Sequence, residues 1–237
     1  MAEHKIAIVA GVGQGLGASI CRELWADGYH IAAVARKPEL LDALADEASS
    51  AGHQLTPILC DLTNADSIKK AFDSINSLKG EIAAYVHNAG QFAMDEFLAM
   101  EASTYEAVWR VTCLSAVHFT QLVLPGMVER KRGALLFTGA TAAVRGSAKF
   151  AAFASAKFAL RGLSQSLARE FGPQGIHVAH LVLDGIIDCD WTRERFGVDR
   201  DRALWPEEVA KNYRYLLAQH PSAWTQELDL RPSVENF

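Results

Sequence analysis

The feature that most constrains this chain is a cluster of glycines directly after its first apolar stretch. Residues 5–10 are nearly all apolar and predict a buried strand, and a helix pattern begins at Ala18. A glycine turn between a strand and a helix suits a diphosphate, because no Cβ keeps the backbone away and the helix N–H groups face the negative charge. Glycines alone are weak support, but this placement strengthens it. We expect the nucleotide contacts Gly11, Gly13, Gln14, Gly15, Leu16 and Gly17, although Gln14 could equally face only water.

Short apolar runs alternate with amphipathic stretches along the rest of the chain. Apolar strands separated by helices predict a parallel sheet covered on both faces. The fold class is therefore α/β: one doubly wound, Rossmann-type domain over residues 1–237, without repeats or a linker. The predicted strands are 5–10, 31–34, 55–60, 82–86, 134–138, 176–183 and 227–230, and the main predicted helices begin at 18, 38, 68, 104, 151 and 206.

One long stretch, residues 184–205, has no regular pattern, and its acidic and basic side chains alternate. A loop of this length after a strand is often functional or mobile. We expect it to form a substrate loop or lid. A solvated surface excursion is the other interpretation.

Composition limits the classes of partner and compartment. The net charge of −5 gives no basic surface for nucleic acid or an anionic membrane. The four cysteines are far apart and form no CxxC pair, which disfavours a disulfide framework or a metal site and favours a reducing cytoplasm. No apolar run is expected to reach the length of a membrane span.

Several motifs in order resemble the short-chain dehydrogenase/reductase family over nearly the whole chain. They are the glycine turn, Asp61 after the third strand, the run 87–90 (His-Asn-Ala-Gly), the run 124–127 (Leu-Pro-Gly-Met) and the run 155–163 around Lys157. The resemblance implies a seven-stranded sheet, a nicotinamide cofactor, a small-molecule substrate and a homodimer or homotetramer built on two long helices. It also implies cofactor contacts at Asp61, Leu62, Asn88, Ala89, Gly90, Lys157, Gly185 and Ile187.

The end of the second strand bears on which nicotinamide cofactor is used. An acid there would bind the ribose 2′-hydroxyl and repel a 2′-phosphate. This chain has Ala35 at that position, followed by Arg36 and Lys37. A guanidinium can grip a phosphate with two N–H groups. We therefore predict NADP(H) over NAD(H); a solvated pair of basic side chains is the alternative.

The family's chemistry implies four site residues, and the sequence departs from three of them. A tyrosine donates the proton, a lysine four residues later lies on the same helical face and lowers its pKa, a serine holds the substrate oxygen and an asparagine organises a water. The corresponding positions here are Phe153, Lys157, Ala140 and Thr112. Only the lysine is retained, so it could keep its ribose contact while the acid–base function has moved or gone.

Three replacements for the missing acid remain open. Thr141 could donate a hydrogen bond to the substrate, and Thr138 or Thr112 could orient a water. Asp184 is a titratable residue that the family pattern lacks, next to the expected nicotinamide site. Phe153 and Ala140 make the substrate end apolar, which favours an apolar or aromatic ligand stacked on the nicotinamide, such as an apolar carbonyl compound, over a small polar alcohol. The functions that compete are an atypical NADP(H)-dependent oxidoreductase, an inactive cofactor-binding sensor or partner subunit, and a reductase of an activated C=C or imine.

Overall fold

The computed structural model describes residues 4–235, whose centre is a sheet of seven parallel strands. The strand order is β3-β2-β1-β4-β5-β6-β7, so the order reverses between β1 and β4. This confirms the predicted fold class. The strands are β1 (Lys5–Ala10), β2 (His30–Ala35), β3 (Leu55–Leu59), β4 (Glu81–His87), β5 (Gly133–Thr138), β6 (Ile176–Leu183) and β7 (Glu227–Leu230).

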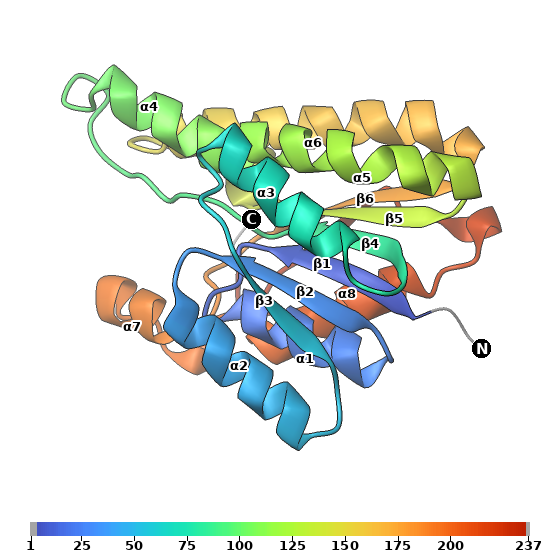
Figure 1. Ribbon diagram of the computed structural model, residues 1–237. Helices are drawn as coiled ribbons and strands as arrows, with labels where there is room; N and C mark the ends of the chain where they lie inside the picture. Colours follow the sequence, from blue (N-terminus) through green and yellow to red (C-terminus); the bar gives the residue numbers. More distant parts are fainter. Residues whose placement is uncertain (1–3, 236–237) are drawn as a thin grey trace.

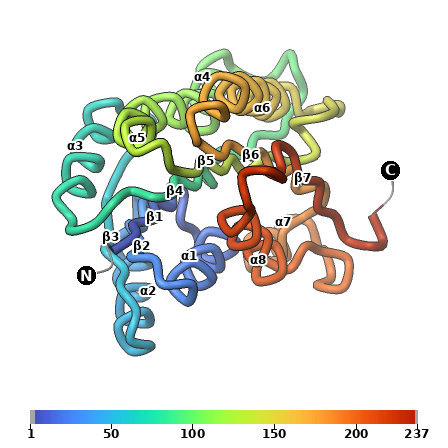
Figure 2. Tube along the Cα trace, turned by 90° about the vertical axis from the view of Figure 1, so that its right-hand side faces the viewer, coloured from blue at the N-terminus to red at the C-terminus, as the bar shows by residue number. Residues whose placement is uncertain are grey.

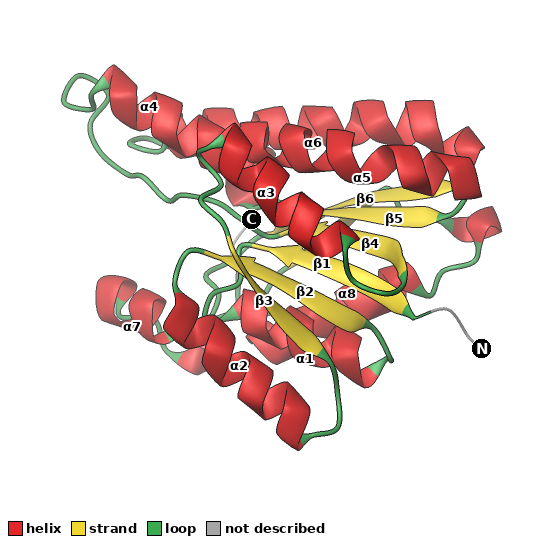
Figure 3. Cartoon of the chain, viewed as in Figure 1, coloured by secondary structure: helices red, strands yellow, loops and turns green. Residues whose placement is uncertain are grey.

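Helices cover both faces of the sheet (Figures 1 and 2). The first face carries α3 (Ala65–Asn76), α4 (Ala102–Trp109), α5 (Ser115–Arg130) and α6 (Ala151–Phe171). The second face carries α1 (Leu16–Ala26), α2 (Pro38–Ser50) and α8 (Pro206–Leu217). The short helix α7 (Asp190–Phe196) stands beyond the carboxyl ends of the strands (Figure 3).

Strand side chains explain why both faces need a cover. Successive residues of a strand point to opposite faces. In β1, Ile6 and Ile8 belong to the core on the side of α3, α5 and α6, while Ala7 and Val9 belong to the core on the side of α1, α2 and α8. Both sets are fully buried, so the continuously apolar strand pattern reflects two cores rather than one.

The helix predicted at 104–128 is interrupted. A π-helical turn, Arg110–Leu114, separates α4 from α5. The whole run Ala102–Arg130 is long and apolar enough by composition to cross a membrane, the one exception within residues 4–235 to our expectation about membrane spans. Half of its most apolar window is buried, and Phe119 and Met127 pack into the core, which is how the core helix of a globular domain behaves.

The stretch 184–205 is more ordered than its sequence indicated. It contains α7 and a 3₁₀ turn at Arg200–Arg202, and Ile187 pairs with Leu204. The buried carboxylate of Asp188 accepts hydrogen bonds from Arg193 and Arg200 at 2.6–3.0 Å. The charges that obscured this helix in the sequence are therefore the groups that fasten the segment.

Candidate active site

The glycine turn lies at the carboxyl end of β1, where the strand order reverses and a crevice forms. The backbone N–H groups of Gly11 and Val12 both donate to the carbonyl oxygen of Val34. The Asn88 side chain donates to the Gly11 carbonyl oxygen at 2.9 Å. Gly11 has a φ of +88°, and a Cβ there would lie 2.5 Å from the Ala89 Cα, so only glycine fits.

The other glycines of this turn differ in what surrounds them. A Cβ on Gly17 would lie 2.7 Å from the Val12 Cα, so this glycine lets α1 pack closely on the turn. A Cβ on Gly13 would meet nothing within 4 Å, so this glycine faces open space. Gly15 caps α1 without a side-chain hydrogen bond. An open cradle at a helix start without a side-chain cap fits a diphosphate.

Arg36 and Lys37 follow β2 at the far end of the same crevice, and both side chains are exposed. Asp61 follows β3 nearby, and its carboxylate accepts hydrogen bonds from the backbone N–H and the hydroxyl of Thr63. These hydrogen bonds, and more weakly the charge of Arg36, lower the pKa of Asp61. Leu62 beside it is buried. Arg36 therefore lies within electrostatic reach of Asp61, one of the expected cofactor contacts.

Lys157 projects from α6 into the interior and is only 4% exposed. Its Nζ donates to the backbone carbonyl oxygen of Thr138 at 2.7 Å and lies 5.7 Å from the centre of the Phe153 ring. A Cβ placed on Gly90 would lie 3.4 Å from this Nζ and 3.8 Å from the Thr112 Oγ1. Burial lowers the pKa of Lys157 from 10.5 to about 8, because removal from water penalises the charged ammonium.

Behind the lysine, a buried histidine secures the π-helical turn. His87 Nε2 lies 3.1 Å from the backbone carbonyl oxygen of Thr112, and His87 Nδ1 lies 2.8 Å from the Tyr85 hydroxyl. A carbonyl oxygen only accepts, so Nε2 carries the proton and Nδ1 accepts from the tyrosine. Burial, and secondly the charge of Lys157, lowers the pKa of His87 to about 3, so this histidine is neutral.

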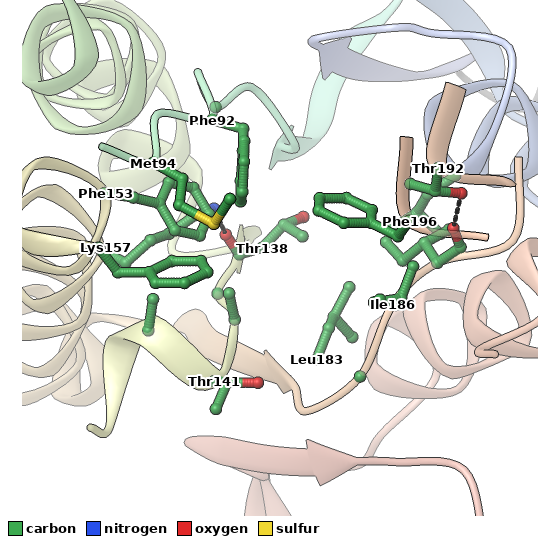
Figure 4. A pocket seen from close by; sticks show the side chains of 18 of the residues that line it. Phe92, Met94, Thr138, Thr141, Phe153, Lys157, Leu183, Ile186, Thr192 and Phe196 are labelled. Carbon is green, nitrogen blue, oxygen red and sulfur yellow. Dashed lines mark hydrogen bonds between the residues drawn. The ribbon is translucent and has the colours of Figure 1, made fainter. Parts of the chain in front are cut away.

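A cavity of about 730 Å³ opens beside Lys157 (Figure 4). Phe153 lies on the lysine side of this cavity, and Phe196 of α7 lies opposite. Its walls are mainly apolar, and its polar lining residues include Thr141 and Thr138. The Thr138 hydroxyl is hydrogen-bonded to the Tyr213 hydroxyl at 2.7 Å. The residues that we predicted and that line this one cavity are Leu16, Asn88, Gly90, Ala140, Phe153, Lys157, Gly185 and Ile187.

Asp184 does not stand free at the cavity. It is buried at the end of β6, where it accepts a 2.6 Å hydrogen bond from the Thr141 hydroxyl. Arg145 and Arg231 lie 3.6 and 3.2 Å from its two oxygens. A carboxylate with these partners is better suited to linking β6 to neighbouring segments than to donating a proton. The Thr141 hydroxyl is engaged in the same contact.

Sequence reasoning missed the aromatic side chains that close this cavity. Phe92 follows β4 in a loop, and Trp191 and Phe196 come from α7. The Phe92 ring centre lies 5.8 Å from that of Trp191 and 5.7 Å from that of Phe196. Neither segment shows the periodicity of a core element; the concentration of aromatic residues in 191–196 was the only available signal.

Comparison with known proteins places these features in a family. The family model described as short chain dehydrogenase matches residues 5–197. The 3-oxoacyl-[acyl-carrier-protein] reductase FabG of Escherichia coli is 29% identical over 191 residues, which cover 81% of this chain and 77% of that protein. Dehydrogenase/reductase SDR family member 11 of Bos taurus is 25% identical and covers 98% of this chain and 97% of that protein.

Solved structures agree. A short-chain dehydrogenase from Rhodopseudomonas palustris has 31% sequence identity and a TM-score of 0.83, covering 97% of this chain and 98% of that one. A metagenomic short-chain oxidoreductase in complex with NADP has 25% identity and a TM-score of 0.86 over the same shares of the two chains. The chain therefore belongs to the short-chain dehydrogenase family of oxidoreductases.

Proposed function

We propose that this protein is an NADP(H)-dependent oxidoreductase that reduces an apolar carbonyl compound, or a related acceptor, at an atypical active site. The observation that carries this proposal is the position of Lys157, buried beside an apolar cavity that also reaches the cradle at the start of α1. The diphosphate would lie against Gly13, Gly15 and Gly17. Asn88 would support this turn through its hydrogen bond to Gly11.

When bound, the cofactor supplies a hydride for the carbon of the acceptor. Lys157 would bind the nicotinamide ribose, as the family resemblance implies. Phe153 and Ala140 would exclude bulk water from the reacting atoms and orient the acceptor by contact, and positioning of this kind can supply much of a rate. We also propose cofactor contacts near the nicotinamide end of the crevice, at Ala89, Gly90, Gly185 and Ile187.

The proton must come from a group other than residue 153, because a phenylalanine has none to give. Lys157 is the titratable side chain at the foot of the cavity, and its lowered pKa makes its ammonium a better acid than an exposed lysine. We assign the proton to this ammonium, passed to the acceptor oxygen through a water oriented by Thr112, because the Thr138 hydroxyl is hydrogen-bonded to the Tyr213 hydroxyl at 2.7 Å. Lys157 would then regain its proton from solvent. The products would be the alcohol and oxidised cofactor.

Preference for NADP(H) over NAD(H) is part of this proposal. Ala35 leaves out the acid that would repel a 2′-phosphate, and Arg36 presents an exposed guanidinium beside it. Titration of both cofactors tests this. Arg36→Ala should weaken NADPH binding about ten-fold, the size expected for a charged hydrogen bond, and leave NADH binding nearly unchanged. Ala35→Asp should reverse the preference. An NADPH preference that survives both substitutions defeats the idea.

A second candidate is an inactive cofactor-binding protein that acts as a sensor or partner subunit. Phe153, Ala140 and Thr112 favour it, because together they remove the side chains of the usual proton path while the cradle stays intact. NADPH oxidation against a panel of carbonyl compounds separates the two functions. Turnover by the natural sequence eliminates the sensor, whereas tight NADPH binding without turnover of any compound eliminates the oxidoreductase.

A homodimer or homotetramer in the cytoplasm remains part of the proposal. Trp109 on α4 and Phe158 on α6 are 41% and 43% exposed, and a second copy packed on these helices would cover them. The four cysteines are unpaired, and three of them are buried, which is compatible with a reducing compartment. Light scattering coupled to gel filtration tests the oligomer: a single monomer peak would remove it.

A further inference from the structure

We propose that the aromatic side chains of the cavity select an acceptor that carries an aromatic ring next to its reacting carbon. We call Phe92, Phe153, Trp191 and Phe196 the aromatic clasp. This inference rests on the proposed function, since it names the substrate class of the same site. It goes beyond an apolar substrate because aromatic rings distinguish an aryl group from an aliphatic group of equal size.

The clasp is built around one ring. Phe92 lies 5.4 Å from Phe153, 5.8 Å from Trp191 and 5.7 Å from Phe196, measured between ring centres. The Trp191 and Phe196 rings meet Phe92, and one another, edge to face at 72–88°. Residues from the loop after β4, from α6 and from α7 therefore meet in one cluster at the cavity wall.

Edge-to-face packing is the arrangement that a further aromatic ring can extend. The face of an aromatic ring is electron-rich and its edge is electron-poor, so rings gain about 0.5–1.5 kcal/mol per pair beyond the burial of their area. A saturated ring buries a similar area without this gain. The Arg195 guanidinium lies 5.6–5.7 Å from the centres of the Phe92, Trp191 and Phe196 rings, which fixes the clasp further.

The positions of Lys157 and of α7 on opposite sides of the cavity orient such a substrate. Lys157 and the Thr138 carbonyl lie at one side, and Phe196 lies across the cavity from them (Figure 4). A carbonyl oxygen directed toward Lys157 leaves the body of the molecule against α7. Trp191 is 50% exposed, so an apolar occupant would also cover a large apolar side chain.

The experiment compares three methyl ketones with NADPH: acetophenone, cyclohexyl methyl ketone and the linear 2-octanone. We expect kcat/KM for acetophenone to exceed that for the cyclohexyl compound about ten-fold, the size of two ring–ring contacts. Trp191→Leu and Phe196→Leu should bring this ratio close to one. Trp191→Phe, the matched control, keeps a ring and should retain most of the preference.

Equilibrium binding gives a second readout that does not need turnover. Acetophenone should quench tryptophan fluorescence saturably in the presence of NADP⁺, and this quenching should be lost in Trp191→Leu. NADPH oxidation with equal rates for aryl and cyclohexyl ketones, or a preference for 2-octanone, overturns the aromatic selection and leaves the oxidoreductase standing. Absent turnover with intact acetophenone binding overturns the oxidoreductase instead, and absent acetophenone binding overturns the clasp.

Discussion

Lys157 gives the sharpest prediction, because its charged ammonium is buried. The pKa of Lys157 falls from 10.5 to about 8 on folding. Below pH 8, where the folded and the unfolded protein both carry the ammonium charge, this shift lowers the free energy of unfolding by about 3 kcal/mol. Replacing Lys157 by Met removes this cost, and it also removes a charge-assisted hydrogen bond to the Thr138 carbonyl, whose loss costs about 2 kcal/mol. We therefore expect Lys157→Met to be more stable than the natural protein by about 1 kcal/mol at pH 7.

The sign of the pH dependence follows from proton counting. Between pH 8 and 10.5 the unfolded chain holds the proton of Lys157 and the folded chain has released it, so the contribution of this lysine to stability rises with pH. The advantage of Lys157→Met should therefore shrink and then reverse across this window, a relative change of about 3 kcal/mol. Other groups also titrate in this pH range, but their contributions to stability are the same in both proteins and cancel in the difference.

Urea unfolding of the cofactor-free proteins at pH 7.5, 9 and 10.5 measures this difference. Lys79→Met, at an exposed lysine, is the control and should change by less than about 0.5 kcal/mol at every pH. A difference between wild type and Lys157→Met that stays flat from pH 7.5 to 10.5 would refute the reasoning, because the lysine would then be hydrated or paired. The same pKa predicts that kcat/KM for carbonyl reduction falls above about pH 8, where the ammonium loses its proton.

Three further predictions concern the cradle, the acid position and the segment 184–205. Gly17→Ala should lower stability by about 2 kcal/mol in urea unfolding, because its Cβ would press on Val12, whereas Gly13→Ala should fold normally and lose NADPH affinity in a titration. Phe153→Tyr should raise carbonyl reduction about 100-fold in an NADPH-oxidation assay, the scale of one general acid; an unchanged rate would mean that proton transfer does not limit turnover. Asp188→Asn should speed proteolytic cleavage within 184–205, since the carboxylate fastens two arginines there, and equal cleavage rates would count against that role.

The fold was predictable because its signals are local and repeated. The central strands of the parallel sheet are largely apolar on both faces, as β1 shows with Ile6 and Ile8 in one core and Ala7 and Val9 in the other. The glycine turn was predictable too, since Gly11 and Gly17 are required by close backbone contacts. The contact that requires Gly17 lies within the turn itself, at Val12, whereas the contact that requires Gly11 comes from Ala89, after β4.

The parts that escaped prediction depend on contacts between distant segments. Phe92 and Phe196 are far apart in sequence. They meet because the loop after β4 and helix α7 both lie at the carboxyl ends of the strands. Asp184 was one of the open candidates for the missing acid, and the residues next to it in sequence gave no sign of its ion pairs with Arg145 and Arg231. The π-helical turn before α5 likewise contacts a distant residue, since the Thr112 carbonyl oxygen in it accepts a hydrogen bond from His87 at the end of β4.

A crystal structure with bound NADP⁺ tests the central claim most directly. We predict that the diphosphate lies against Gly13 and Gly15, the 2′-phosphate near Arg36, and the nicotinamide beside Lys157, with the Phe153 ring where the family resemblance implies a phenol. A crevice that stays empty at saturating NADP⁺, or a tyrosine hydroxyl brought within hydrogen-bonding distance of Lys157, would contradict it.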